Sequence, residues 1–513
     1  MSSTTSKIQI SSSGKYRRYN LLIWLAAILL LIVGLGVRLS DLTDEPLDFH
    51  PTRQLRGAII ARGIYYGMLP NADPQLRKMA VNFANSTGQY EPPILETLVA
   101  YTYQIIGGEH LWVARIYSSI FWIIGGIFLF SLAKRMFTPI SALVSLGYYL
   151  LLPFSAQASR SFQPDPSMVM WLILSVYALF RWSQDQAWKW TILAGLFGGM
   201  AIITKAVSVY IVAAIALAIV LNTLGLRHSL RKIQVWVMAA LMVAPSAIFY
   251  LVQHQGRASE YFANWTIALS HLIIEPAFYM RWFNLIQSLM GFTILLLAGL
   301  GVLISKARDK TLLFGLWIGY FVYGLTVPYQ MYTHTYYHLQ LIPIVSLSLA
   351  PVAQVIIEKL KDQRNVWQVI FAGIAILAIV FPAWVSINTF TSEDHRNEPA
   401  YWQKIGSLLP TDGKILALTQ DYGYRLMYYG WRKVTLWQTS GEQELADLRG
   451  KEKDFEASFT NKIEGMDYFV ITAFNQLNSQ PKLKEFLSTH YPILAEGNGY
   501  LIYDLAHPQN PQP

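Results

Sequence analysis

Long apolar runs alternate with short polar connections along most of the chain, and this pattern predicts a bundle of membrane-spanning helices. The first run, residues 21–37, follows a basic cluster at 15–18 and has no small-residue cleavage site. We therefore expect a retained first span rather than a signal peptide. Ten further runs, giving about 11 spans in all, fall near 112–133, 138–155, 166–181, 189–204, 206–222, 232–252, 284–305, 311–327, 337–356 and 366–388.

A long polar stretch, residues 38–111, separates the first span from the second. Within it, EPPILETLVAYTYQIIG at 91–107 is apolar but contains Glu96 and is shorter than the roughly 20 residues that a crossing needs. We expect this segment to form a juxtamembrane helix at the outer interface. A second short helix is predicted from Pro51 to Tyr66, because proline is well placed in the first turn of a helix.

Basic clusters give the predicted orientation of the spans. If residues 91–107 do not cross, the clusters at 134–135, 181–189, 227–232, 306–310 and 359–364 all lie on the cytoplasmic side, as the positive-inside rule requires. The connections near 160–165, 205, 254–282 and 328–338 then lie outside. This assignment predicts a multi-pass plasma-membrane protein with a cytoplasmic N-terminus and an extracytoplasmic C-terminus.

The two ends of the chain are polar. Residues 1–19 are rich in Ser, Thr and Lys and are predicted to form a disordered cytoplasmic tail before a transmembrane domain at 20–390. Residues 391–513 alternate between helical patterns, at 398–408, 441–457 and 480–490, and strand patterns, at 414–419, 467–473 and 499–505. This alternation predicts a soluble extracytoplasmic α/β domain, which either covers the outer cavity, helps to hold an acceptor or is a passive cap.

The composition agrees with a polytopic α-helical membrane protein. Of the 513 residues, 53% are hydrophobic and 14% are charged, whereas about a quarter are charged in soluble domains. The net charge of +9 comes from scattered clusters, and no basic patch interleaved with aromatic residues indicates binding of nucleic acid. The chain contains no cysteine, which excludes disulfides and thiolate chemistry.

The candidate chemistry begins in LDFHPTRQ, just after the first span. Asp48 lies three residues before Pro51, where it either caps the helix, is a solvated loop acid, or takes part in chemistry. Arg53 and Gln54 lie in the first turn of the same helix. The other outer-face residues bear on which of these three interpretations holds.

Lys205 lies between two apolar runs, where a lone ammonium needs an anionic partner or water. Either it extends to the interface, or it binds a phosphate, where an opposite charge about 4 Å away contributes about 4 kcal/mol at an effective dielectric near 20. The segment YTHTYYH brings His334, Tyr337 and His338 to the entrance of a later span. An aromatic belt explains the tyrosines but not both histidines.

Three further outer segments carry ionisable residues. Asp165 stands between two prolines in SRSFQPDPS, where a helix cap is the alternative to a functional role. Glu91 before two prolines and Arg115 near the start of the next span put opposite charges near the same face. His50 and His334 with the acids are candidates for a divalent metal site, although no HExxH spacing supports one.

In this order, the outer-face motifs resemble those of the C-type (GT-C) glycosyltransferases, and within them the protein mannosyltransferase and aminoarabinose transferase-like family. The resemblance covers most of residues 20–390, and the C-terminal domain resembles the extracytoplasmic domain that some members carry. The matching segments are LDFHPTRQ, EPP, GEHLWVARIYSS, RSFQPD, the lysine after the fifth span and HTYYH, which contain Asp48, Glu91, Arg115, Asp165, Lys205 and His334 to His338.

The resemblance implies a GT-C fold and a sugar donor linked to a polyprenyl phosphate, with a protein, lipid or glycan as acceptor. An acceptor hydroxyl would attack the anomeric carbon and displace the lipid phosphate with inversion. Asp48 would be the general base. The groups that would stabilise the leaving phosphate are Lys205, Arg53, His338 and Tyr337. The groups that would position the acceptor or neighbouring residues, or hold an optional metal, are Glu91, Asp165, Arg115, His50 and His334.

One departure from the family pattern limits this interpretation. Many relatives have adjacent acids, as in HPDE, where this chain reads HPTR, with Thr52 and Arg53. Asp48 is then the single candidate base in this loop, and a metal held there is less expected. Two other functions stay open: a transporter or flippase of lipid-linked substrates, whose usual inverted repeats the sequence lacks, and a non-catalytic scaffold with the same fold.

Overall fold

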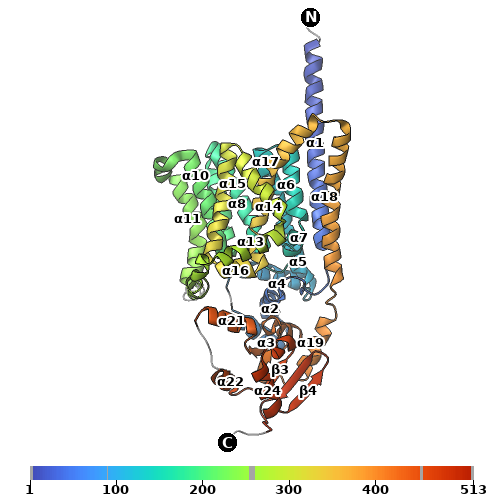
Figure 1. Cartoon of the computed structure of the whole chain (residues 1–513), viewed down its shortest axis with the longest axis vertical. Helices are drawn as coiled ribbons and strands as arrows, with labels where there is room; N and C mark the ends of the chain where they lie inside the picture. Colours follow the sequence, from blue (N-terminus) through green and yellow to red (C-terminus); the bar gives the residue numbers. More distant parts are fainter. Residues whose placement is uncertain (1–3, 89, 254–259, 261, 451–454, 510–513) are drawn as a thin grey trace. The chain divides into compact units, whose positions relative to one another are not determined.

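The computed structural model describes residues 4–88, 90–253, 260, 262–450 and 455–509 (Figure 1). Most of these residues are helical, and a single sheet lies near the C-terminus. The first helix, α1 (Thr4–Leu39), includes residues 4–19, which the composition predicts as a disordered tail. Since the apolar span already supplies the helix nucleus, each polar residue that extends it adds a backbone hydrogen bond without a new nucleation cost.

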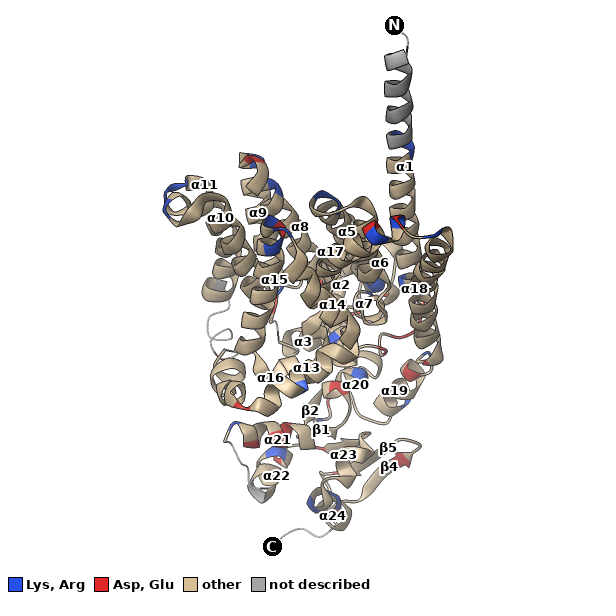
Figure 2. Cartoon of the chain, turned by 45° about the horizontal axis from the view of Figure 1, so that its top comes forward, with Lys and Arg blue, Asp and Glu red and all other residues tan. Residues whose placement is uncertain are grey.

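Six helical segments of the described chain are long and apolar enough to cross a membrane. They are 17–39, 112–136, 206–231, 233–252, 335–361 and 365–392. A bent pair of helices makes a seventh if it forms one span, so the predicted number of about 11 crossings stays a prediction. Figure 2 shows that the ribbons of these helices carry few charged residues, which gather toward the helix ends.

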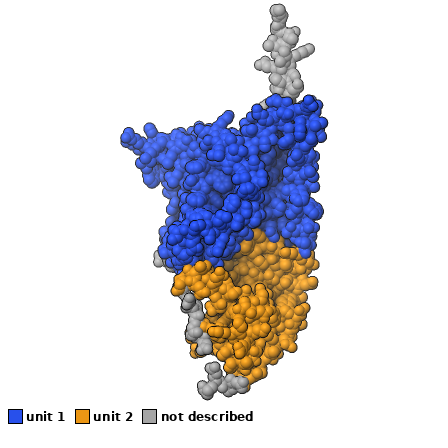
Figure 3. Space-filling view, viewed as in Figure 1, with its two compact units in different colours: residues 1–42, 90–92, 114–392 blue, residues 43–89, 93–113, 393–513 orange. Residues whose placement is uncertain are grey.

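The chain forms two compact units, coloured in Figure 3. Unit 1 contains residues 1–42, 90–92 and 114–392. Unit 2 contains residues 43–89, 93–113 and 393–513. The predicted C-terminal domain therefore packs into one unit with most of the stretch that the sequence suggests is a loop of the membrane domain.

Unit 1 is a helical bundle whose remaining helices are α5 (Trp112–Met136), α6 (Pro139–Leu151), α7 (Pro153–Ala158), α8 (Asp165–Asp185), α9 (Trp188–Thr204), α10 (Val209–Arg231), α11 (Ile233–Ala247), α13 (Pro276–Met290), α14 (Phe292–Ile304), α15 (Ala307–Thr326), α16 (Pro328–Thr333), α17 (Leu341–Lys361) and α18 (Asn365–Ser392). In the most apolar stretch of the span that includes α17, 72% of the residues are buried, whereas the corresponding share for α18 is 11%. Helix α17 is therefore central in the bundle and α18 is peripheral. Figure 1 shows α18 beside α1, where Val37, Ala156 and Phe390 form a small core.

Small residues permit close helix contacts in unit 1. A Cβ on Gly301 of α14 would lie 1.8 Å from the Ser348 carbonyl oxygen of α17, and one on Gly319 of α15 would lie 2.7 Å from the Ile211 Cα of α10. Helices in a membrane associate largely through such close packing. At Gly291, φ is +89°, and α13 and α14 meet at 97°. The segment predicted as a span at 284–305 is therefore broken at Gly291 rather than one continuous helix.

Unit 2 contains the helices α2 (Pro51–Met68), α3 (Pro74–Ser86), α4 (Ile94–Ile106), α19 (Glu398–Ser407), α20 (Tyr424–Tyr429), α21 (Ser440–Leu448), α22 (Phe455–Ile463), α23 (Phe474–Asn478) and α24 (Pro481–His490). Its sheet has the order β2-β1-β3-β5-β4 and the strands β1 (Ile415–Leu418), β2 (Val434–Leu436), β3 (Tyr468–Ile471), β4 (Ile493–Gly497) and β5 (Tyr500–Asp504). Strand β1 is parallel to β2 and β3, whereas β5 is antiparallel to β3 and β4. Aromatic and aliphatic side chains around Trp437 and Phe469 form its core.

Candidate functional site

A buried ion pair joins two of the predicted site residues in unit 1. Asp165 is the first residue of α8, and Lys205 directly follows the last residue of α9. Lys205 Nζ donates to Asp165 Oδ1 at 2.6 Å, and the two residues are 5% and 1% exposed. The helix cap before α8 is Pro164, so Asp165 does not cap this helix.

Two aromatic rings also lie close to the Lys205 ammonium. Its Nζ lies 4.9 Å from the ring centroid of Tyr336 and 4.8 Å from that of Tyr337. Both tyrosines belong to the short 3₁₀ helix at 335–338, and both are buried. A cation over two aromatic faces is attracted by the ring quadrupoles, so the tyrosines help to hold the charge of Lys205 inside the bundle.

Polar atoms at the start of α8 are left unsatisfied. Of the two carboxylate oxygens of Asp165, Oδ2 is buried and has no hydrogen-bond partner within the described chain. The same holds for both amide atoms of Gln163, which is 2% exposed. Native proteins rarely leave such groups without a partner, and a polar ligand is one explanation. Gln163 is a candidate that sequence reasoning missed although it lies within the RSFQPD segment, since a neutral glutamine is less conspicuous there than the charges of Arg160 and Asp165.

Two buried arginines bind the chain where it leaves the first span. Arg115 Nη1 donates to the carbonyl oxygens of Asp41 and Leu42, at 3.2 and 3.1 Å, and Arg160 Nη2 donates to Asp41 O at 2.9 Å. Arg115 thus fixes the exit of α1. Glu91 is half-buried in the short segment 90–92 of the same unit.

The two histidines of YTHTYYH differ in their surroundings. His338 is fully buried, with Nδ1 2.6 Å from the Tyr320 hydroxyl and Nε2 3.0 Å from the Met331 carbonyl oxygen. The carbonyl requires a proton on Nε2, so Nδ1 accepts from Tyr320 in the neutral ring. The predicted phosphate contact would require His338 to exchange one of these bonds. His334 is half-buried, and its Nδ1 lies 2.7 Å from Thr333 Oγ1.

Asp48, His50 and Arg53 belong to unit 2, and all three are half-buried. The predicted helix over Pro51–Tyr66 is confirmed as α2, whose cap is His50 at φ 47° without a side-chain hydrogen bond. Asp48 is therefore not the cap. Its Oδ1 accepts from Gln54 Nε2 at 3.2 Å, and the same Nε2 donates to Phe49 O at 2.8 Å. The buried Gln54 orients the Asp48 carboxylate.

The start of α2 is tied to the C-terminal part of unit 2. Thr52 Oγ1 donates to Asp421 Oδ1 at 3.0 Å, and Asp421 Oδ2 accepts from Arg425 Nε at 2.6 Å. The segment that carries Asp48 is thus held by side chains nearly 370 positions along the chain. In the described part of the chain, no three His, Asp or Glu side chains gather as a metal ion would require.

The family model for dolichyl-phosphate-mannose-protein mannosyltransferases matches residues 90–252 of this chain. The chain is also similar to the lipid A galacturonosyltransferase RgtD of Rhizobium johnstonii, with 22% identity over 208 residues. That match covers 40% of this chain and 44% of the relative, so the chain spans less than half of the length of the curated relative it matches.

Solved structures show the fold over nearly the whole chain. ArnT from Cupriavidus metallidurans, solved bound to undecaprenyl phosphate, has a TM-score of 0.57 at 16% identity and covers 96% of this chain and 99% of its own. The archaeal oligosaccharyltransferase AglB of Archaeoglobus fulgidus, in complex with an inhibitory peptide and a dolichol-phosphate, has a TM-score of 0.54 at 13% identity, with 95% and 75% covered. Together these similarities confirm the predicted resemblance to the GT-C glycosyltransferases.

Proposed function

We propose that this GT-C superfamily chain transfers a sugar from a polyprenyl-phosphate donor to an extracytoplasmic acceptor, with inversion at the anomeric carbon. The observation that carries the proposal is the buried Lys205–Asp165 pair, which keeps a positive charge inside an apolar bundle beside an unsatisfied carboxylate oxygen. A phosphate attached to a lipid suits that position, because its tail stays in the membrane while its charge reaches Lys205.

In the proposed reaction, the acceptor hydroxyl oxygen forms a bond to the anomeric carbon as the bond from that carbon to the phosphate oxygen breaks. Asp48 takes the hydroxyl proton, and Gln54 keeps its carboxylate oriented through the 3.2 Å hydrogen bond. The electron pair of the broken bond goes to the lipid phosphate. Lys205 stabilises the charge that grows there, with Arg53 as a further cation.

Asp165 has a positioning role in this mechanism. Its carboxylate neutralises Lys205 while no donor is bound and fixes the direction of the ammonium through the 2.6 Å contact. Tyr336 and Tyr337 restrict the same ammonium from the side of their rings. A cation held in this way needs little reorganisation when the phosphate charge develops, and such preorganisation is often the largest catalytic contribution.

Relatives support the donor class but not a particular acceptor. One similar structure holds undecaprenyl phosphate and another holds a dolichol-phosphate. We infer the same type of lipid carrier for this chain, and an acceptor that is a protein, a lipid or a glycan. The charge pattern of the connections supports a cytoplasmic N-terminus, with the C-terminal domain at 391–513 and the acceptor on the extracytoplasmic side.

The experiment is a transfer assay with a panel of labelled polyprenyl-phosphate sugars and membranes that contain the full chain. We expect Asp48→Asn to lose about 10²- to 10⁴-fold in transfer rate, the usual contribution of a general base. The matched control is Asp73→Asn, because Asp73 is an acid of unit 2 that caps α3 and asparagine caps equally well. A parallel reaction with chelator decides whether a divalent metal takes part.

Equal donor consumption by wild type and Asp48→Asn would show that Asp48 is not the base. If the donor crosses the membrane without being consumed, the protein is a flippase instead. Substitution of Lys205 separates donor binding from sugar transfer. It should abolish binding of the polyprenyl phosphate itself, whereas Asp48→Asn should leave that binding intact.

A further inference from the structure

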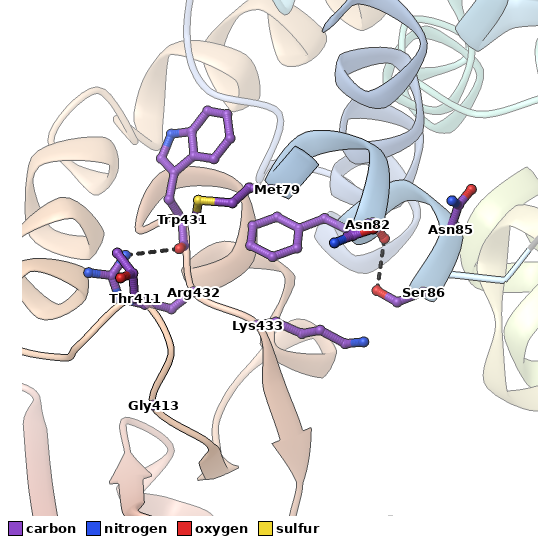
Figure 4. Close-up of a pocket in the computed structure, with 10 residues that line it drawn as sticks. Met79, Asn82, Asn85, Ser86, Thr411, Gly413, Trp431, Arg432 and Lys433 are labelled. Carbon is purple, nitrogen blue, oxygen red and sulfur yellow. Dashed lines mark hydrogen bonds between the residues drawn. The ribbon is translucent and has the colours of Figure 1, made fainter. Parts of the chain in front are cut away.

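A cavity of about 510 Å³ opens within unit 2, between α3 and the segments 411–413 and 431–433 (Figure 4). Small-molecule sites usually have volumes of about 300–1,000 Å³. The proposed transfer chemistry uses none of the residues that line this cavity. Its walls come from two distant parts of the sequence, and each wall is held in place by contacts of its own.

The first wall is the polar face of α3. Asn82, Asn85 and Ser86 are exposed there, at spacings of three and four residues that put them on one side of the helix. A Cβ on Gly63 of α2 would lie 2.3 Å from the Ala84 Cβ, so glycine at this position lets α3 pack directly on α2. The three side chains thus present hydrogen-bonding groups from a fixed backbone.

The second wall is positively charged. Arg432 donates to Leu409 O from Nε at 2.9 Å and from Nη2 at 2.6 Å, and to Trp431 O from Nη1 at 3.0 Å. These partners are all neutral carbonyls, and burial lowers the pKa of the Arg432 guanidinium. Lys433 beside it is exposed and also lines the cavity. The lining residues include two cations, and the one acid in the segments that form the walls, Asp412, is not among them, so the cavity favours an anion.

Trp431 supplies an apolar surface between the two walls. Its φ of 51° is unusual for a bulky residue, and such strain persists only where the surroundings enforce it. The Arg62 guanidinium lies 4.4 Å from the Trp431 ring and is itself fixed by Glu109 at 2.7 Å. Met79 lines the cavity beside this ring (Figure 4).

We propose that this cavity is a binding site for an anionic saccharide. The carboxylate of an acidic sugar pairs with Lys433, its hydroxyls bond to Asn82 and Asn85, and the apolar face of a sugar ring lies on Trp431. The combination of hydrogen-bonding amides, an aromatic surface and positive charge without acids distinguishes this ligand from a neutral glycan and from a simple anion. The proposal does not depend on the transfer reaction.

The test is calorimetric titration of the purified full chain in detergent with a tetrasaccharide of alternating glucuronic acid and N-acetylglucosamine. A neutral tetrasaccharide of N-acetylglucosamine, inorganic phosphate and glycerophosphate are the comparison ligands, and the last two represent a phospholipid headgroup. We expect the acidic tetrasaccharide to bind at least fivefold more tightly than each of them, with affinity that falls as salt is added.

Two variants and one control locate the site. Lys433→Gln should weaken binding of the acidic tetrasaccharide about fivefold, and the double variant Asn82→Ala/Asn85→Ala about tenfold, because a charge contact and two hydrogen bonds are removed. Lys482→Gln, which removes an exposed lysine of α24 away from the cavity, should bind as wild type does. Thermal unfolding of all variants should match wild type, since each changed side chain is exposed.

The proposal is overturned by any of three results. The first is that wild type does not bind the acidic tetrasaccharide. The second is that the neutral tetrasaccharide or phosphate binds as tightly as the acidic one. The third is that Lys433→Gln and the double asparagine variant both bind the acidic tetrasaccharide as tightly as wild type does. Because no donor lipid is present, failure here leaves the transfer function untouched. Loss of transfer in Asp48→Asn likewise leaves this site untouched.

Discussion

Lys205→Met and Asp165→Asn, alone and together, form a double-mutant cycle that tests the buried pair most directly. Each single substitution leaves one charge inside the bundle, where Lys205 and Asp165 are 5% and 1% exposed. Removing one partner of a buried ion pair typically costs about 3–5 kcal/mol. The double variant leaves no charge, so we expect it to lose less stability than either single variant, which corresponds to a coupling free energy greater than about 3 kcal/mol.

Unfolding of the purified full chain in mixed micelles, followed by tryptophan fluorescence, measures these differences. Lys359→Met is the matched control, since Lys359 is exposed at the end of α17 and its removal should change the free energy of unfolding by less than about 0.5 kcal/mol. The reasoning would be refuted if each single variant lowered the free energy of unfolding by less than about 1 kcal/mol and the two effects were additive. A charge left without its partner inside the bundle should cost more than that.

The same cycle separates stability from binding. We expect the double variant to be folded but unable to bind undecaprenyl phosphate, because the ammonium that meets the phosphate is gone. If the double variant bound the lipid phosphate as wild type does, the pair would be purely structural.

Three further predictions concern packing, capping and orientation. Gly301→Ala should destabilise unit 1 by about 1–3 kcal/mol because the new Cβ meets the carbonyl of α17, whereas Gly299→Ala on the same helix has open space and should not lower the unfolding temperature. Thr439→Ala should cost about 1 kcal/mol, since Thr439 forms a capping box with α21, and an unchanged unfolding temperature would count against that role. In this cysteine-free chain, Ser488→Cys should react with an impermeant maleimide in intact cells and Gln363→Cys only after lysis, and the reverse result would invert the predicted orientation.

Elements with a strong local pattern could be predicted from the sequence. The strands predicted at 414–419, 467–473 and 499–505 correspond to β1, β3 and β5, whose side chains are mostly buried. The edge strands β2 and β4 were not predicted. Strand β2 has only three residues, too few for a periodic signal, and β4 is mostly exposed and has an irregular register. Their pairing depends on the neighbouring strands rather than on their own residues.

The residues of the candidate site also divide into those that a local pattern indicates and those that depend on distant contacts. The sequence indicated Lys205 and Asp165 because charges at membrane depth are conspicuous, and the structure joins them. It could not indicate that Tyr320 and Met331 occupy both ring nitrogens of His338, because those bonds depend on how η5, the 3₁₀ helix at 335–338, packs against α15 and α16. The break at Gly291 was missed for a similar reason, since apolar residues continue on both sides of it.

The assembly of unit 2 from separated segments has a consequence for biosynthesis. Arg62 of α2 needs the carbonyl of Tyr428, 2.5 Å from its Nη1, and α2 emerges from the ribosome more than 300 residues before that partner. Since synthesis proceeds at about 5–20 residues per second, a nascent chain holds α2 without this C-terminal partner for about 20–70 seconds. During that interval α2 and α3 are accessible to chaperones and proteases, and a truncation before Tyr428 removes this partner of Arg62 altogether.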